Sequence, residues 1–133
     1  MSELRIWIVI AWVSLPTVMY GGYSLLRFLN RGNVLTPFQA TWFRAGHAHA
    51  GVLLLMSLIY YLFLAGTPLP ASVKHLACAA LGVGTLAQSG GFFIHMIVGK
   101  PGHASIGTMV TGAGAVLLAV AIGVLVYGLV IAR

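Results

Sequence analysis

Residues 43–65 read FRAGHAHAGVLLLMSLIYYLFLA: one arginine and two histidines precede an unbroken apolar run. A helix that crosses a membrane needs about 20 consecutive, mostly apolar residues, and residues 45–65 satisfy this requirement. The stretch therefore predicts a transmembrane helix that carries His47 and His49 near its start. Ionisable groups at membrane depth are rare and usually functional, so the same stretch is the first place to search for a site.

The rest of the chain has the same character. Of its 133 residues, 60% are hydrophobic and only 6% are charged, which is typical of membrane proteins. The expected helices span residues 5–29, 45–65, 73–98 and 103–131. Short connections rich in proline and glycine favour antiparallel neighbours. We therefore predict an all-α, integral membrane, antiparallel four-helix bundle that forms a single domain over residues 1–133.

Two further structural expectations follow from local sequence. Residues 29–44 form the longest connection and are expected to be an interfacial loop. Pro16 is expected to kink the first helix, because a proline inside a helix removes one backbone hydrogen bond. The first apolar segment is longer than the core of a cleavable signal peptide and is expected to remain part of the protein.

The charge distribution points to a lipid bilayer as the main partner. The net charge of +6 comes from seven Lys and Arg residues spread along the chain, mostly near the ends of the expected helices. Nucleic-acid binding requires a basic patch or stripe, so we exclude that class. Cations at helix ends are typical of interfacial anchors. We expect a multi-pass protein, such as those of the bacterial inner membrane.

Four histidines are predicted to approach one end of the bundle. Because consecutive helices alternate in direction, the start of the second helix, the end of the third and the start of the fourth meet at the same end. These positions carry His47, His49, His95 and His103. His75 lies at the opposite end, beside Lys74, and is interpreted as an interfacial residue.

Two stripes at helical spacing accompany these histidines. One stripe is Gly84, Gln88, Gly91 and His95, and the other is His103, Gly107, Thr111 and Gly114. Small residues let membrane helices pack closely, and Gln, Thr and His form hydrogen bonds between helices. A packing role and a ligand-binding role are both open for these stripes.

His47 and His49 are expected to act separately. Successive helical residues are about 100° apart, so these two side chains point to nearly opposite sides of the helix. One metal ion is not easily bound by both. We expect one histidine to face its own bundle and the other to face a neighbouring subunit or a second ligand.

Haem is the ligand that best matches this chemistry. Neutral imidazole suits copper and zinc, but Glu3 is the only acidic residue, so a divalent ion would lack a carboxylate to balance its charge. Ferric haem brings its own counter-charge and is commonly held by histidine. Arg44 lies three residues before His47, on the same helical face, where a propionate would bind. The predicted cofactor-binding residues are His47, His49, Arg44, His95, His103 and Gln88, with His47 and His49 as the metal ligands.

Two resemblances support this interpretation. The sequence GHAHAGVLLL resembles the His-x-His helix of haem–copper oxidase catalytic subunits, whose two histidines bind two different haems. The stretch WFRAGHAHAG, followed by AQSGGFF, a Pro-Gly turn and an apolar fourth helix, is similar to styrene oxide isomerase. That resemblance implies four helices, a homotrimer, haem b at the subunit interface, and His47 as its ligand.

The match to the isomerase is incomplete. Leu53 and Phe93 fall near the positions of that family's asparagine and tyrosine, and Gly46 is inserted before His47. The oxidase resemblance lacks the His-His pair and the carboxylate path for protons. The resemblances thus leave open an isomerase-like enzyme, an oxidoreductase, and a protein that binds a small apolar substrate or a gas. The catalytic residues are not identified.

Two other classes also remain open. In the first, the histidines, together with Met96 and Met109, belong to a protein that binds or transports copper or zinc. Alternatively, the histidines only form hydrogen bonds in a structural or assembly subunit.

Overall fold

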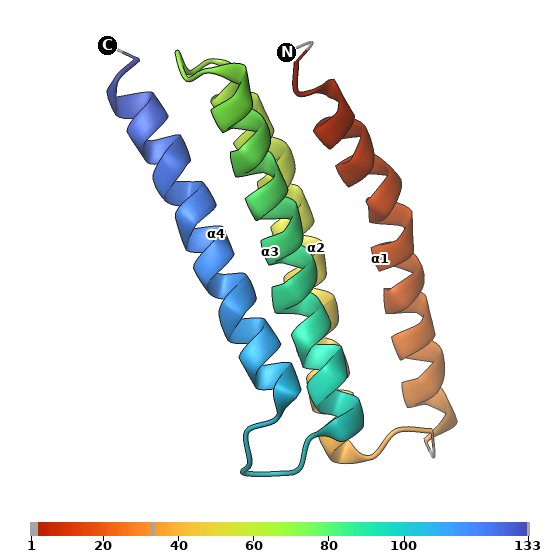
Figure 1. The fold of residues 1–133 in the computed structure, drawn as a ribbon. Coiled ribbons are helices and arrows are strands. Elements are labelled where there is room, and N and C mark those ends of the chain that lie inside the picture. Colours follow the sequence, from red (N-terminus) through yellow and green to blue (C-terminus); the bar gives the residue numbers. More distant parts are fainter. Residues whose placement is uncertain (1–2, 33, 133) are drawn as a thin grey trace.

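The computed structural model describes residues 3–32 and 34–132 and contains four long helices (Figure 1). The helices are α1 (Arg5–Arg31), α2 (Pro37–Ala65), α3 (Ala71–Val98) and α4 (Ile106–Val130). The described ranges contain no strand. Each helix is long and apolar enough to cross a membrane. The all-α, four-helix prediction is therefore confirmed.

Helices α2, α3 and α4 contact one another, whereas α1 packs mainly on α2. The most extensive contact is between α3 and α4, followed by α2 with α3 and then α1 with α2. In Figure 1, α1 and α4 stand at the two edges of the molecule. Only Ala11 and Leu25 are buried on α1. The N-terminal helix is thus held mainly along one side.

The two glycine stripes predicted from the sequence face each other between α3 and α4. A Cβ atom added to Gly91 would lie 2.6 Å from the carbonyl oxygen of Gly107, and one added to Gly84 would lie 3.1 Å from that of Gly114. The Thr111 hydroxyl donates to the backbone carbonyl of Gln88 at 3.4 Å. Small residues let the backbones approach this closely, so the packing interpretation is confirmed for the glycines.

The start of α2 differs from the expectation. The helix begins at Pro37, not near residue 45, because Thr36 and Gln39 form a capping box. The Thr36 hydroxyl accepts from the Gln39 N–H at 3.2 Å, and Gln39 Oε1 accepts from the Thr36 N–H at 3.0 Å. Residues 37–44 are therefore helical. His47 lies about 15 Å along the helix from its first residue.

Two other helix ends also differ from the sequence-based bounds. α1 runs through Pro16 and continues to Arg31, two residues beyond the predicted end. α4 begins at Ile106, because Ser105 and Thr108 cap its first turn. His103 consequently lies in the connection between α3 and α4 and not on the α4 stripe.

Several of the most deeply buried side chains lie in the half of the molecule away from that connection. Leu64, Leu81 and Cys78 are fully buried there. Lys74, at the start of α3, donates from Nζ to the Ala65 carbonyl at 3.2 Å. This bond satisfies one of the free carbonyls at the end of α2.

Gly114→Ala should lower the free energy of unfolding by about 1–3 kcal/mol, because its Cβ would lie 2.8 Å from the Gly84 carbonyl oxygen. Gly112→Ala is the matched control on the same helix, since no described atom lies within 4 Å of its added Cβ. Thermal unfolding of the purified protein in detergent compares the two. Equal stability losses in both variants would contradict the proposed close contact.

Candidate functional site

His47 projects from α2 toward α1. Its imidazole lies against Gly21 and Gly22, and a Cβ atom added to Gly22 would be only 2.9 Å from His47 Nε2. The half-buried ring therefore fits because glycine lacks a side chain at that point. His47 also lines a cleft between α1, α2 and α3.

His49 is held differently, on the side of α2 that meets Phe92 of α3. Its ring centroid lies 4.6 Å from that of Phe92. Its Nδ1 is 2.8 Å from the carbonyl oxygen of Ala45, one turn earlier on α2. A carbonyl only accepts hydrogen bonds, so in the neutral imidazole Nδ1 carries the proton and Nε2 has the lone pair. Histidines that bind metals commonly have this arrangement.

His95 ties the end of α3 to the start of α4. It is buried, and its Nδ1 forms a 2.7 Å hydrogen bond with Ser105 Oγ, the N-cap hydroxyl of α4. Its ring also packs on Trp42 and Phe38 of α2, with centroid distances of 4.2 and 5.4 Å. Its contacts are those of a structural histidine at a three-helix junction.

The other predicted residues are dispersed. His103 is exposed, with Nδ1 2.9 Å from the Pro101 carbonyl oxygen. Arg44 is exposed on α2. Gln88 meets α4 through its backbone, where its amide nitrogen and Cα lie close to Gly114. His75 accepts a 3.0 Å hydrogen bond from Trp7 Nε1, at the opposite end of the molecule.

His47, His49, His95 and His103 thus belong to the same end of the molecule but do not converge. Among the described residues, no group of three or more His, Cys, Asp or Glu side chains could hold a metal ion. The expected opposition of His47 and His49 does occur, since one contacts α1 and the other contacts Phe92. Any ligand of one histidine is separated from a ligand of the other by α2 itself.

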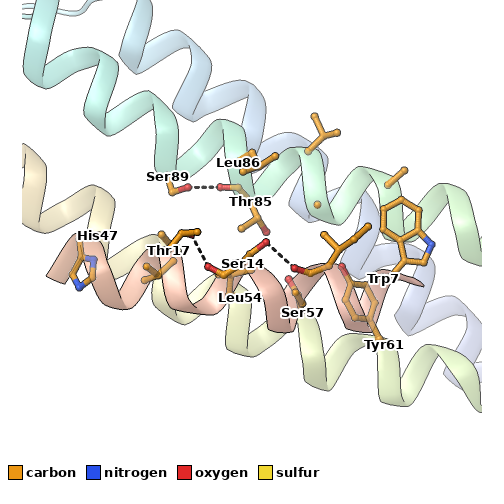
Figure 2. Close-up of a pocket in the computed structure, with 18 of the residues that line it drawn as sticks. Trp7, Ser14, Thr17, His47, Leu54, Ser57, Tyr61, Thr85, Leu86 and Ser89 are labelled. Carbon is orange, nitrogen blue, oxygen red and sulfur yellow. Dashed lines mark hydrogen bonds between the residues drawn. The ribbon is translucent and has the colours of Figure 1, made fainter. Parts of the chain in front are cut away.

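Sequence reasoning missed the cleft beside His47. Its volume is about 470 Å³, and Figure 2 shows His47 toward one end with Trp7 and Tyr61 toward the other. The signal in the sequence was a set of Ser and Thr residues inside apolar helices. These are Ser14, Thr17, Ser57, Thr85 and Ser89, all of which line the cleft.

Comparison with known proteins adds no relative: no family model, no curated protein and no solved structure matches this chain. The function must therefore be inferred from the chemistry of the chain. The geometry offers one histidine held through Nδ1 by a backbone carbonyl, His49, and one histidine beside a cleft, His47.

His95→Ala should lower the free energy of unfolding by about 1–3 kcal/mol, because it removes a buried ring and leaves Ser105 without that partner. His103→Ala provides the matched control and should stay within about 0.5 kcal/mol, since His103 is exposed. Chemical or thermal unfolding in detergent measures both. If His95→Ala left the free energy of unfolding unchanged, the structural role of His95 would be excluded.

Proposed function

We propose that this chain is a multi-pass membrane protein that binds haem b through a histidine of α2. Four apolar helices support membrane insertion, as do large apolar side chains exposed along them, such as Tyr20, Leu55, Leu76 and Val116. These residues would face lipid. The chain's cations lie mostly near the helix ends or in the connections, where interfacial anchors occur.

The hydrogen bond of His49 is the observation that carries the haem proposal. The Ala45 carbonyl holds the proton on Nδ1 and leaves the Nε2 lone pair for iron. Phe92 lies against the imidazole, and Trp42 stacks on Phe92 with centroids 5.8 Å apart. A flat, apolar macrocycle suits these aromatic surroundings.

His47 is less suited to bind iron within one chain. Its Nε2 is close to the position that a Gly22 side chain would occupy, so little space separates that nitrogen from the α1 backbone. We therefore propose that His49, rather than His47, would hold the haem iron. This assignment reverses the preference for His47 that follows from resemblance to styrene oxide isomerase.

The propionates would lie toward the cations at the same end of the molecule. Arg44 is five residues before His49 and hence about 140° away around α2. Lys100 and His103 are exposed in the connection between α3 and α4. We propose that Lys100 and His103 bind the propionates of haem held by the same chain. Arg44 would bind the propionates of haem held by a neighbouring copy.

A homotrimer is part of the same proposal. α1 contacts mainly α2, and α1 and α4 stand at the two open edges of the molecule. These open edges would be covered by neighbouring copies, as resemblance to the isomerase implies. Haem with one histidine ligand provides an open iron site for an apolar substrate or gas, whereas two histidine ligands favour electron transfer.

Haem reconstitution followed by visible absorption tests the ligand assignment. Purified protein mixed with haemin should develop a Soret band, and His49→Ala should lose it because the Nε2 ligand is gone. His47→Ala should keep most of the band, and His75→Ala should keep all of it because His75 lies at the other end. If His49→Ala took up haem and His47→Ala lost the Soret band, His47 would be the iron ligand. No uptake by the unaltered chain would refute the proposal.

Membrane insertion is tested by cysteine labelling in sealed vesicles. In a Cys78→Ala background, cysteines introduced at Gly32 and Gly102 should react with an impermeant maleimide from the same side. A cysteine at Pro68 should react from the other side, because α2 and α3 each cross between these connections. Labelling of positions 32 and 102 from opposite sides would exclude the four-span topology.

A further inference from the structure

The cleft between α1, α2 and α3 has the dimensions of a binding site for an elongated molecule. Its volume is about 470 Å³, and its α2 wall runs from His47 to Tyr61. These residues are 14 positions apart, which corresponds to about 21 Å along a helix. The cleft lies beside His47 and contacts neither His49 nor Phe92, so it is separate from the proposed haem site.

The lining restricts the charge of the occupant. None of the described residues that line the cleft is an Asp, Glu, Lys or Arg. Most of the wall is apolar, with contributions from Val18, Leu54, Leu86 and Phe93. A charged ligand would lose its water without gaining an ionic partner, at a large cost in free energy. The occupant is therefore uncharged and mostly apolar.

One hydroxyl among the residues of the wall has no partner in the described part of the chain. Four of the five Ser and Thr residues that line the cleft donate to backbone carbonyls of their own helices: Ser14 to Ile10, Thr17 to Ser14, Ser57 to Leu53, and Ser89 to Thr85. The exception is the hydroxyl of Thr85. Its side chain is only 5% exposed, and its Oγ1 has no hydrogen-bond partner among the described residues.

The unpaired hydroxyl lies partway along the cleft. Figure 2 shows Thr85 on α3 and Ser14 on α1 at facing walls, between His47 at one end and Trp7 at the other. A buried hydroxyl without a partner is costly. An oxygen of a bound molecule that accepted a hydrogen bond from Thr85 would remove this cost.

We propose that the cleft binds an elongated, uncharged, mostly apolar molecule with one oxygen, such as a ketone carbonyl, that accepts a hydrogen bond from Thr85. The side-chain bond from Trp7 to His75 joins α1 and α3 at one end of the molecule, but these helices lack extensive contact along their length. The ligand enters between them. This proposal does not depend on haem binding, because His49 lies on the other side of α2.

Photolabelling of the full-length purified protein in lipid nanodiscs tests the proposal. The first probe is a long-chain aliphatic ketone that carries a diazirine, and the second is the same molecule with a methylene in place of the carbonyl. We expect saturable labelling of cleft residues by the ketone, mapped by mass spectrometry. The methylene probe should label the same residues about five- to tenfold more weakly, because it cannot accept the Thr85 hydrogen bond.

Thr85→Val tests whether the cleft recognises the ketone oxygen, and Gly82→Leu, described next, tests whether the probes occupy the cleft. Thr85→Val keeps the shape and removes the donor, so ketone labelling should fall to the level of the methylene probe. The ligand-free variant should be as stable as the unaltered protein or more stable, because an unpaired buried hydroxyl is removed. A purely structural Thr85 would instead give a less stable variant with unchanged selectivity between the probes.

Gly82→Leu should block labelling by both probes. Gly82 lines the cleft, and no described atom lies within 4 Å of its added Cβ, so the leucine occupies open space without disturbing the helices. Gly90→Leu is the matched control on α3, because its Cβ is equally unobstructed but Gly90 does not line the cleft. It should label normally.

Three results would overturn the proposal. These are equal labelling by the two probes in the unaltered protein, unchanged labelling in Gly82→Leu, and ketone selectivity that survives in Thr85→Val. The first result would mean that the cleft accepts lipid chains without polar recognition. The Soret band of haem-reconstituted protein reports separately on His49, so failure of one proposal is distinguishable from failure of the other.

Discussion

Direct contact between the backbones of α3 and α4 is the constraint on which the rest of the structure depends. Glycines on the two helices face one another so closely that an added Cβ at Gly91 would lie 2.6 Å from the Gly107 carbonyl oxygen. Between helices in lipid, packing and hydrogen bonds replace the hydrophobic effect as the main attraction. The α3–α4 pair therefore provides the rigid part of the molecule, and α2 and then α1 pack onto it.

The positions of the histidines follow from this arrangement. At the end of the α3–α4 pair, His95 is used for the hydrogen bond with Ser105, so its ring serves the junction. α2 packs against α1 and α3 and makes a smaller contact with α4. Its His-x-His sequence places one imidazole toward α1 and the other toward α3. The glycines of α1 accept the ring of His47, while the aromatic ring of Phe92 accepts that of His49.

The near absence of acidic residues limits which side chains and backbone groups can bind a ligand at the two proposed sites. With Glu3 as the only carboxylate, an iron or substrate site within the helices must use neutral imidazole, hydroxyls and backbone carbonyls. The Ala45 carbonyl orients His49 in the role that a carboxylate often has beside a metal-bound histidine. On the other side of α2, Thr85 provides the uncharged donor for a ligand in the cleft. One helix thus separates two environments of different chemistry.

Hydrophobic segment length determined the number and order of the helices, since about 20 apolar residues are needed to cross a bilayer. Helical periodicity also predicted that the α3 and α4 glycines share faces and that His47 and His49 oppose each other. The start of α2 could also be predicted, because Thr36-Pro37 followed by Gln39 is a capping signal that hydropathy does not detect.

Periodicity along one helix, however, does not specify which helix covers a given face. Only the tertiary structure decided that His47 meets Gly22, that His95 pairs with Ser105, and that α1 and α3 diverge to leave a cleft around Thr85, because these contacts depend on how separate helices pack across long distances in sequence.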